Sequence, residues 1–238
     1  SMLLSVQYRM HPSISAFSSA LFYDSLLATP TFLRDWRPFP RVVGRVLPVA
    51  GCNVSVRFVN VNGQQNEQRG RMNRFTRTIY GTASSAPADA QTSYRNQAEA
   101  TRVMEILKGI LKKEEDEPSS KSTIGIVSPY AGQVALIKEL MKTDEEFHQL
   151  SHNLVEPVEV KSVDGYQGRE RDIIIFSAVR SNRNGDVGFL KDWRRMNVAL
   201  TRSRSALILV GDLTTLKQGD RHWAALGKWC EGVNCIVD

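Results

Sequence analysis

The fold of this chain is decided by residues 161–204, which read KSVDGYQGRERDIIIFSAVRSNRNGDVGFLKDWRRMNVALTRSR. The pattern predicts a strand, a polar turn marked by glycines, a second strand and an arginine-rich helix. Gly165 and Gly168 allow the backbone to approach a ligand closely, and Glu170 supplies a directed hydrogen-bonding group. Four arginines bring fixed positive charge, namely Arg194, Arg195, Arg202 and Arg204. Because forked cations of this kind bind polyphosphates well, we expect this stretch to handle phosphate groups.

The sequence lacks one motif that a complete nucleotide site needs. Nowhere does it carry the loop G-x-x-x-x-G-K-[ST], whose backbone amides and lysine cradle nucleotide phosphates. We therefore expect the ligand of these arginines to be held mainly by another domain. Ser1 and Met2 are typical of an expression scar, and the chain begins abruptly within a motif, so we expect it to be a piece of a larger protein.

Composition places the chain among soluble globular proteins. Its 238 residues, 42% hydrophobic and 24% charged, suffice for one core, or one core plus an insertion, and exclude general disorder. The net charge of +6 favours an anionic partner without requiring one. No apolar run approaches the ~20 residues that cross a bilayer, so we expect no membrane. Cys52, Cys230 and Cys235 are odd in number and lack metal-ligand spacing, which predicts no metal site and reduced thiols in the cytoplasm or nucleus.

Short apolar runs alternate with amphipathic stretches along the chain. Strands are predicted over 56–61, 123–128, 158–163, 172–179, 206–211 and 234–237, most of them apolar throughout, as in a sheet covered on both faces. Helices are predicted over 13–22, 94–113, 131–147, 193–202 and 213–231 from apolar spacings of three or four residues. This order predicts an α/β fold with a mostly parallel sheet and helices on both faces. Ligands are then expected at the carboxyl ends of the strands, near the turn 164–170.

Two polar segments interrupt this order. Residues 62–92 are poor in aliphatic side chains and rich in Gly, Ser and Asn, which predicts a flexible insertion or a long loop outside the core. Four arginines in this segment either line a nucleic-acid path or are simply solvated at the surface, namely Arg69, Arg71, Arg74 and Arg77. Residues 112–121 are predicted to form a mixed-charge linker ahead of a strand.

Four ordered motifs carry a resemblance to a known family. They are QYRMHPSISAFSSALFY at 7–23, TSYRNQAEA at 92–100, GIVSPYAGQ at 125–133 and the block 162–204. Together they resemble the second RecA-like domain of superfamily 1 helicases, within the branch that contains the nonsense-mediated-decay helicase and senataxin. The resemblance covers nearly the whole chain. It implies a single RecA-like domain over 1–238, of the P-loop NTPase type but lacking its own P-loop.

The resemblance implies one half of a motor that hydrolyses ATP and moves 5′ to 3′ along single-stranded RNA or DNA. ATP with Mg²⁺ would lie between this domain and a first RecA-like domain of the same polypeptide, which would supply the P-loop lysine and the magnesium ligands. We then expect the fragment alone to be inactive, and the protein to act as a monomer. Two alternatives stay open: a catalytically inactive nucleic-acid-binding or scaffold module of the same fold, and a DNA-directed helicase.

The family's motifs assign a nucleotide role to five residues. Tyr8 would stack on adenine and Arg9 would reach the γ-phosphate, which suits a flat ring and a forked cation. Gly168 and Glu170 match the turn that touches the nucleotide, where the glutamate meets the ribose or an arginine. Arg202 matches the arginine finger, which stabilises charge developing on the phosphoryl oxygens. Without the family, Tyr8 would pack under the next helix and Glu170 would be a surface ion-pair partner of its neighbours.

Nucleic-acid contact is expected where two strands end. Pro129 and Tyr130 follow one of these strands, and they resemble positions where the family grips the nucleic-acid backbone. Ser162 and Val163 end the other strand and resemble such positions too. The alternative is purely structural, because Pro and Tyr are also common where a chain turns into a helix.

Other conspicuous residues are assigned to structure. Met10 and His11 precede a helix start, where a lone histidine is more often a cap or a packing residue than a catalyst. Trp223, Leu226 and Trp229 are spaced three apart in the last predicted helix. That spacing favours a packing stripe over a base-stacking platform.

Overall fold

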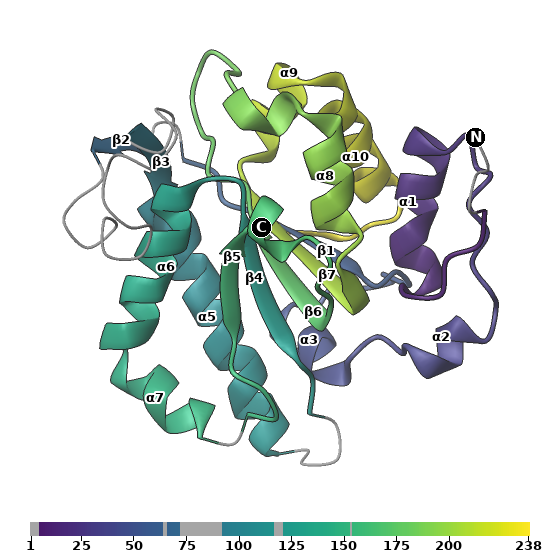
Figure 1. Ribbon diagram of the computed structural model, residues 1–238, viewed down its shortest axis with the longest axis horizontal. Helices are drawn as coiled ribbons and strands as arrows, with labels where there is room; N and C mark the ends of the chain where they lie inside the picture. The colour runs from purple at the N-terminus through teal and green to yellow at the C-terminus, as the bar shows by residue number, and fades with distance from the viewer. Residues whose placement is uncertain (1–4, 64–65, 72–91, 117–120, 153) are drawn as a thin grey trace.

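The computed structural model of the chain describes residues 5–63, 66–71, 92–116, 121–152 and 154–238. Within these residues, six parallel strands form one sheet in the order β5-β4-β6-β7-β1-β8 (Figure 1). Their bounds are β1 Val56–Asn60, β4 Ile124–Ser128, β5 Glu159–Ser162, β6 Arg171–Ser177, β7 Ser203–Gly211 and β8 Ile236–Val237. Each predicted strand is therefore present, with ends that differ by a few residues from the prediction.

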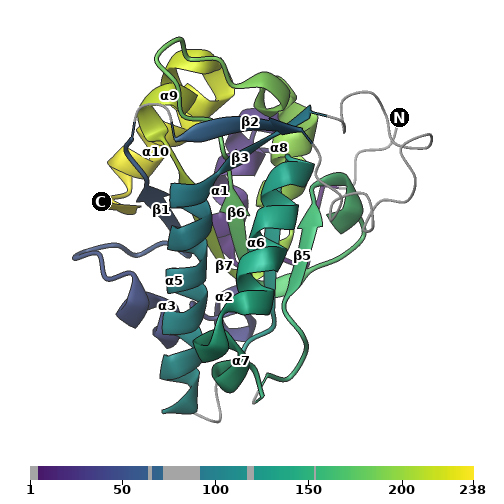
Figure 2. The same ribbon diagram turned by 90° about the vertical axis from the view of Figure 1, so that its left-hand side faces the viewer.

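Helices cover both faces of the sheet, as Figures 1 and 2 show. On one face lie α3 Arg41–Val46, α5 Gln97–Glu115, α6 Ala131–Thr143 and α7 Glu145–Ser151. On the other lie α1 Pro12–Phe22, α8 Trp193–Leu200, α9 Leu213–Gly219 and α10 Arg221–Gly232. The short helix α2 Leu33–Trp36 and the 3₁₀ turns η3 Asp164–Tyr166 and η4 Gly188–Lys191 lie in connections. The predicted RecA-like α/β fold, with helices on both faces of a parallel sheet, is confirmed.

The central strands are apolar throughout because both of their faces are buried. In β6, Ile173 and Ile175 belong to the hydrophobic cluster that contains α5. Ile174 and Phe176 alternate with them and belong to the cluster on the opposite face. Successive strand residues point to opposite faces, so a continuous apolar run supplies both clusters at once. This is why the strands could be found from the sequence.

The helix predicted over 94–113 starts too early, because Tyr94 lies in a strand. β3 Thr92–Asn96 pairs antiparallel with β2 Glu67–Arg71, and this hairpin lies at the upper ends of α5 and α6 in Figure 2. α5 begins only after Asn96, whose side chain accepts the backbone N–H of Glu99 as an N-cap. Pairing with a strand distant in sequence thus overrides the local helical spacing.

The strand β2 lies within the segment 62–92, so the described part of that segment is not only loop. Of the arginines considered there, Arg69 and Arg71 belong to β2, whereas Arg74 and Arg77 lie outside the described residues. α5 extends to Glu115 and therefore takes up the first part of the predicted linker 112–121.

Two long predicted helices each break in two at an aspartate. The helix predicted over 131–147 divides into α6 and α7, because Asp144 has an extended backbone and its carboxylate caps α7. The helix predicted over 213–231 divides in the same way at Asp220, which caps α10. A short acidic side chain competes for backbone N–H groups, and an apolar repeat alone does not reveal it. Among the described residues, every helix is too short or too polar to cross a bilayer.

The connection from β5 to β6 passes directly over β4. These two strands lie on either side of β4, and their connection holds only the turn η3. The buried Tyr166 ring lies on Gly125 of β4, where an added Cβ would come within 1.9 Å of the tyrosine oxygen, so that position requires glycine. Burial raises the pKa of Tyr166 to about 12. The crossing carries the chain from the carboxyl end of β5 to the amino end of β6, directly after Glu170.

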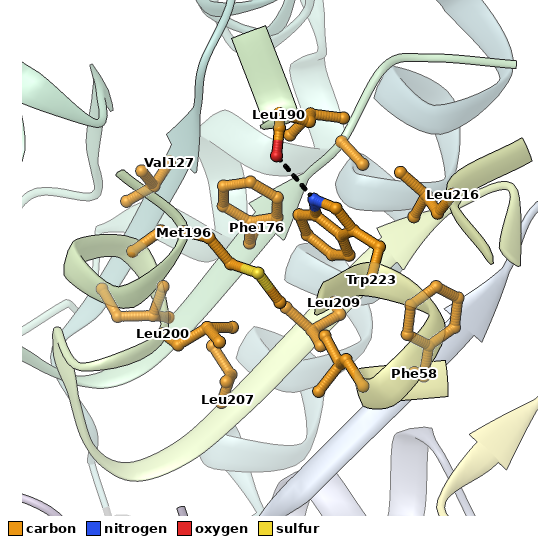
Figure 3. Packing of buried hydrophobic residues seen from close by; sticks show 14 of the residues in the cluster. Phe58, Val127, Phe176, Leu190, Met196, Leu200, Leu207, Leu209, Leu216 and Trp223 are labelled. Atoms are coloured by element: carbon orange, nitrogen blue, oxygen red, sulfur yellow. Dashed lines mark hydrogen bonds between the residues drawn. The ribbon is translucent and has the colours of Figure 1, made fainter. Parts of the chain in front are cut away.

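Trp223 is the largest side chain in the core beneath α10 (Figure 3). It is 1% exposed and stacks on Phe176 with ring centroids 6.0 Å apart. Its Nε1–H donates to Leu190 O at 2.9 Å, so the one polar group of the indole is satisfied. Leu226 is 2% exposed in the same cluster, and Trp229 packs against it partly buried. The predicted packing stripe is therefore confirmed.

Trp223→Ala should lower the free energy of unfolding by about 3–5 kcal/mol, because it leaves a cavity and an unpaired carbonyl in the core. Trp36→Ala is the matched control, since that indole is 71% exposed and its loss should cost less than about 1 kcal/mol. Urea unfolding of both variants measures the difference. Equal losses for the two tryptophans would contradict the core role of Trp223.

Candidate functional site

Gln7 shapes the turn that precedes α1. Its Oε1 accepts the backbone N–H groups of Arg9 at 2.9 Å and Met10 at 2.8 Å. Its Nε2 donates to Met10 O at 2.9 Å and to Thr29 Oγ1 at 2.8 Å. Met10 itself is buried in the core. The turn is therefore fixed from inside, and the side chains of Tyr8 and Arg9 project from it.

His11 joins this turn to α1 and to β7. Its Nδ1 accepts the backbone N–H of Ser13 at 3.1 Å and so caps α1, and Pro12 occupies the first helical turn. Its own backbone N–H donates to Arg204 O at 2.8 Å. Burial, and then the charge of Arg34, lower the pKa of His11, which favours the neutral ring that a cap requires. His11 thus has the structural role that we expected.

Glu170 draws two arginines together at the start of β6. Its Oε2 accepts from Arg9 Nε at 2.5 Å. Its Oε1 accepts from Arg204 Nε at 3.0 Å and pairs with Nη2 at 2.8 Å. Burial acts to raise the pKa of Glu170, but the hydrogen bonds from Arg9 and Arg204 outweigh it and lower the pKa, so the carboxylate is charged at neutral pH. One carboxylate therefore joins segments that are far apart in the sequence.

Arg202 lies beside Glu170, just past the end of α8. Its Nε donates to Val198 O at 2.8 Å and its Nη2 to Thr201 Oγ1 at 3.1 Å. The Thr201 carbonyl accepts from Arg9 Nη1 at 3.1 Å, which brings Arg9 close to Arg202. Burial, and then the charge of Arg9, lower the pKa of Arg202. In the part of the chain that the structure describes, no carboxylate forms an ion pair with Arg202.

We call this group the arginine cluster, and its members are Arg9, Arg202, Arg204 and Glu170. Arg204 also approaches Asp172 at 3.5 Å, so three arginines face two carboxylates and one positive charge is uncompensated. An edge that carries excess positive charge on partly exposed guanidinium groups is suited to binding an anion.

The arginine cluster lies at the amino ends of β6 and β7, not at the carboxyl ends where we expected ligands. β6 and β7 begin at paired residues, Arg171 and Ser203, and both follow members of the cluster directly. The expectation was wrong for Glu170 because the crossing over β4 ends at the amino end of β6. The helix predicted over 193–202 also ends early, at Leu200, because the Arg202 carbonyl already accepts the Arg171 N–H of the sheet at 3.2 Å.

The remaining two predicted nucleotide residues are accessible. The Tyr8 side chain is 65% exposed, so it does not pack under α1 as the structural alternative required. Gly168 has a left-handed backbone, with φ of +79°, and there is open space where a Cβ would lie. The backbone conformation, rather than crowding, therefore requires glycine at this position.

The sequence neighbours of Glu170 do not pair with its carboxylate. Arg169 Nη1 pairs with Glu159 at 2.7 Å, and Arg171 Nη2 pairs with the same carboxylate at 3.1 Å. Glu170 instead pairs with Arg204, which sequence reasoning had treated only as a source of charge. The pairing of β6 with β7 brings these two residues together, and no local signal in the sequence indicates it.

Two of the four predicted nucleic-acid residues have buried side chains, so any contact that they make with a strand must come from their backbone groups. Tyr130 is 2% exposed, and its hydroxyl donates to Val187 O at 3.1 Å. Val163 is 4% exposed and belongs to the core beneath the crossing over β4. Neither side chain can reach a strand of nucleic acid. Pro129 and Ser162 are partly exposed at the carboxyl ends of β4 and β5, and Ser162 Oγ accepts the Gly165 N–H at 3.2 Å.

A buried cation lies past the carboxyl end of β6, and sequence reasoning missed it. Arg180 is 2% exposed and donates to the Glu67 carboxylate at 2.9 and 3.2 Å. It also donates to Asp186 at 3.0 Å and lies over the Tyr94 ring at 4.2 Å. Glu67 belongs to β2 and Tyr94 to β3, so Arg180 fastens the hairpin to the sheet. The partners come from segments whose proximity only the fold creates.

A fully buried acid supports a strained turn next to this cation. Glu99 Oε2 accepts from Ser177 Oγ at 2.7 Å and from the Val179 N–H at 2.8 Å. Val179 has a φ of +76°, which a β-branched residue rarely adopts, so the surrounding bonds must hold it there. Burial raises the pKa of Glu99 to about 8, and the charge of Asp212 adds to the rise.

Glu99→Gln tests this acid through the pH dependence of stability. The folded pKa is about 8 and the ordinary value is 4.5, so the folded state binds an extra proton between these values and stability falls as pH rises through that window. The glutamine variant lacks this titration. Its stability relative to wild type should therefore rise by roughly 1–3 kcal/mol from about pH 5 to pH 8. Urea unfolding across this range measures the change, and parallel profiles would rule the idea out.

The chain is similar to known proteins over most of its length. The model of the AAA domain family matches residues 1–214. Helicase sen1 of Schizosaccharomyces pombe is 33% identical over 224 residues, which cover 94% of this chain and 11% of that protein. A regulator of nonsense transcripts 1 homolog of Drosophila melanogaster is 35% identical over 214 residues, or 88% of this chain and 15% of that protein. The DNA polymerase alpha-associated DNA helicase A of Saccharomyces cerevisiae is 32% identical over 233 residues, which cover 96% of this chain and 30% of that protein.

The parallel sheet and these relatives together identify a helicase domain. The chain belongs to the AAA domain family, and within it to the superfamily 1 helicases of the branch that contains the nonsense-mediated-decay helicase and senataxin. The resemblance that the motifs indicated is therefore confirmed. The chain spans between 11% and 30% of the length of the three relatives described above.

Proposed function

We propose that the chain is the second motor domain of an ATP-dependent helicase that moves 5′ to 3′ along single-stranded RNA. The observation that carries the proposal is the arginine cluster, in which Arg9 and Arg202 lie close together and one positive charge is uncompensated. Forked guanidinium groups at a partly exposed edge fit the oxygens of a polyphosphate. In this proposal the substrate is ATP, and the cluster is this domain's contact with its phosphates.

Arg202 is the arginine finger in this proposal. Val198 O and Thr201 Oγ1 hold its Nε and Nη2, which leaves Nη1 without a hydrogen bond among the described residues. A planar cation directed at the γ-phosphate stabilises the charge that grows there in the transition state, an effect worth ~10³-fold or more in rate. Arg9 is oriented by Glu170 and by the Thr201 carbonyl, and it binds the same phosphate.

Tyr8 and Gly168 complete the nucleotide contact on this domain. The exposed Tyr8 ring can stack on adenine, and the left-handed backbone of Gly168 lets the turn approach the nucleotide. Bound Mg²⁺ neutralises phosphate charge, and we place its ligands, with the P-loop lysine, in the first RecA-like domain of the same polypeptide. The cations and the exposed ring present here fit a nucleotide that another domain anchors.

We place the nucleic-acid strand at the carboxyl ends of the sheet strands, opposite the arginine cluster. Pro129 and Ser162 are partly exposed there, at the ends of β4 and β5. Closure of the two motor domains around ATP shifts the grip on the strand, and hydrolysis releases it. The protein acts as a monomer, in the cytoplasm or the nucleus.

One comparison favours a second candidate, a helicase directed at DNA. The relative that is 32% identical is named as a DNA helicase. In this proposal the arginine cluster binds ATP rather than the strand, so its residues do not distinguish RNA from DNA. ATP hydrolysis by the full-length protein, stimulated by RNA and DNA oligonucleotides of matched sequence, separates the two candidates.

Arg202→Ala in the full-length protein should reduce strand-stimulated ATP turnover by ~10³-fold or more, because the growing phosphoryl charge loses its cation. Nucleotide affinity should change by less than about 5-fold, since the finger acts mainly in the transition state. Arg221→Ala is the matched control, because Arg221 is an exposed arginine on α10. Turnover and nucleotide binding are measured on both variants, and near-normal turnover by Arg202→Ala would contradict the finger role.

The isolated chain of 238 residues should hydrolyse ATP negligibly and bind single strands weakly, with a strong dependence on salt. The reason is that the phosphates are anchored by the first motor domain in this proposal. Phosphate release by the isolated chain and by the full-length protein, measured at equal concentration, gives the comparison. Substantial hydrolysis by the isolated chain would contradict a divided site.

A further inference from the structure

Two adjoining hollows lie at the carboxyl ends of β1, β6 and β7. Their volumes are about 500 Å³ and about 480 Å³, and Asn62, Thr214 and Gln218 line both of them. Sites for small ligands usually lie in this range of volume. We call the combined hollow the amide groove, after the four amide side chains in its lining, which are Asn60, Asn62, Asn182 and Gln218; hydroxyl and charged residues also line it.

The topology of the sheet explains why a groove forms there. β1 and β7 are hydrogen-bonded neighbours, with Asn60 opposite Gly211. After β1 the chain runs through the hairpin β2–β3 to α5, which covers one face of the sheet. After β7 it runs into α9, which covers the other face. Where the connections of neighbouring parallel strands diverge in this way, a crevice opens at their carboxyl ends, and α/β proteins commonly bind ligands there.

The walls of the amide groove are held in place by hydrogen bonds. Asn60 Oδ1 accepts the Leu213 N–H at 3.1 Å, which fixes the start of α9. The Asn182 N–H donates to Thr215 Oγ1 at 3.0 Å, and Asn182 Nδ2 donates to Asp186 O at 2.7 Å. The loop after β6 and the start of α9 therefore form a rigid frame on both sides of the groove.

Three side chains in this frame have free hydrogen-bonding groups. Asn62, Thr214 and Gln218 are exposed, and none of them makes a side-chain hydrogen bond to any residue that the structure describes. Two amides and one hydroxyl thus offer donors and acceptors side by side on both parts of the groove. Such a surface recognises a ligand that presents donors and acceptors of its own.

The charged residues that line the amide groove are two cations, Lys217 and Arg183, and two carboxylates, Asp212 and Glu231, so their formal charges balance. The buried Asp212 accepts from Ser181 Oγ at 2.8 Å and from Thr215 Oγ1 at 3.0 Å. Lys217 pairs with Glu231 at 2.5 Å, and Arg183 also has an interaction partner. The groove therefore lacks the excess positive charge of the arginine cluster and is not suited to polyphosphate. Amides are the groups that pair with the edges of nucleobases, so the chemistry fits a neutral, planar base.

We propose that the amide groove binds a base of the single strand on which the helicase acts. The inference rests on the proposed function. The groove lies at the carboxyl ends of the strands, as Pro129 and Ser162 do. From β5 to β1 there are four strand spacings, or about 19 Å. A single strand that runs along these strand ends, past the hairpin that Arg180 fastens beyond β6, would connect the predicted grip with the groove. The arginine cluster lies at the amino ends of the strands, so the domain can hold a base of the strand and the ATP nucleotide at the same time.

The test measures binding of the full-length protein to single-stranded RNA oligonucleotides that each lack the base at one position. The double variant Asn62→Ala/Gln218→Ala removes the free amides, and Gln149→Ala on α7 is the control, at the opposite end of the molecule from α9 in Figure 2. Wild type should lose about 3- to 10-fold in affinity when the base that enters the groove is missing. The double variant should bind the intact oligonucleotide with the same reduced affinity, and removal of the base at that position should not reduce its affinity further. The control should behave as wild type.

The outcomes separate this inference from the proposed function. If the wild-type protein binds no single strand, the proposed function fails and the inference fails with it. If wild type binds and the double variant keeps the same affinity and the same sensitivity to missing bases, the amide groove alone is ruled out. Thermal unfolding of the double variant checks that it is folded. Thr214→Val, which removes only a hydroxyl, repeats the test at the third free side chain if the double variant is unstable.

Discussion

The ion pairs of Glu170 are the interaction on which the arrangement of the site depends. Glu170 precedes β6, Arg204 lies on β7 and Arg9 lies on the turn before α1, so one carboxylate orients cations from two other segments. Without it, Arg9, Arg202 and Arg204 would repel one another at the same edge. These pairs are partly exposed, so they contribute little to stability, and their main effect is to orient the guanidinium groups.

The sheet separates two kinds of chemistry. All its strands run in one direction, so the loops that lead into the strands gather at one end of the sheet and the loops that leave them gather at the other. We call these the amino edge and the carboxyl edge. The amino edge carries the arginine cluster, with its uncompensated charge. The carboxyl edge carries buried Arg180, the strained Val179 and the neutral amide groove. A close-packed sheet between these two ends resists deformation, which would suit the proposed link between a nucleotide on one side and a nucleic-acid strand on the other.

Local patterns in the sequence predicted the parts of the fold that depend on burial. The strands were found because burial on both faces makes them apolar throughout, as in β6. The helix ends at Asp144 and Asp220 were missed, because a single capping carboxylate outweighs an apolar repeat. Tyr130 is predicted to contact nucleic acid because it resembles a family position, but its hydrogen bond to Val187 depends on a segment distant in the sequence.

The sequence by itself determined the α/β class and the family, and it predicted which residues contact a nucleotide, because apolar periodicity and motif order are properties of the chain. The tertiary structure alone decided which residues meet. It placed Arg9, Arg202 and Arg204 around Glu170 at the amino edge, paired Arg180 with Glu67, and left the amide groove open at the carboxyl edge. The physical reason is that ion pairs and grooves depend on distances in space, and the crossing over β4 and the pairing of β6 with β7 set those distances.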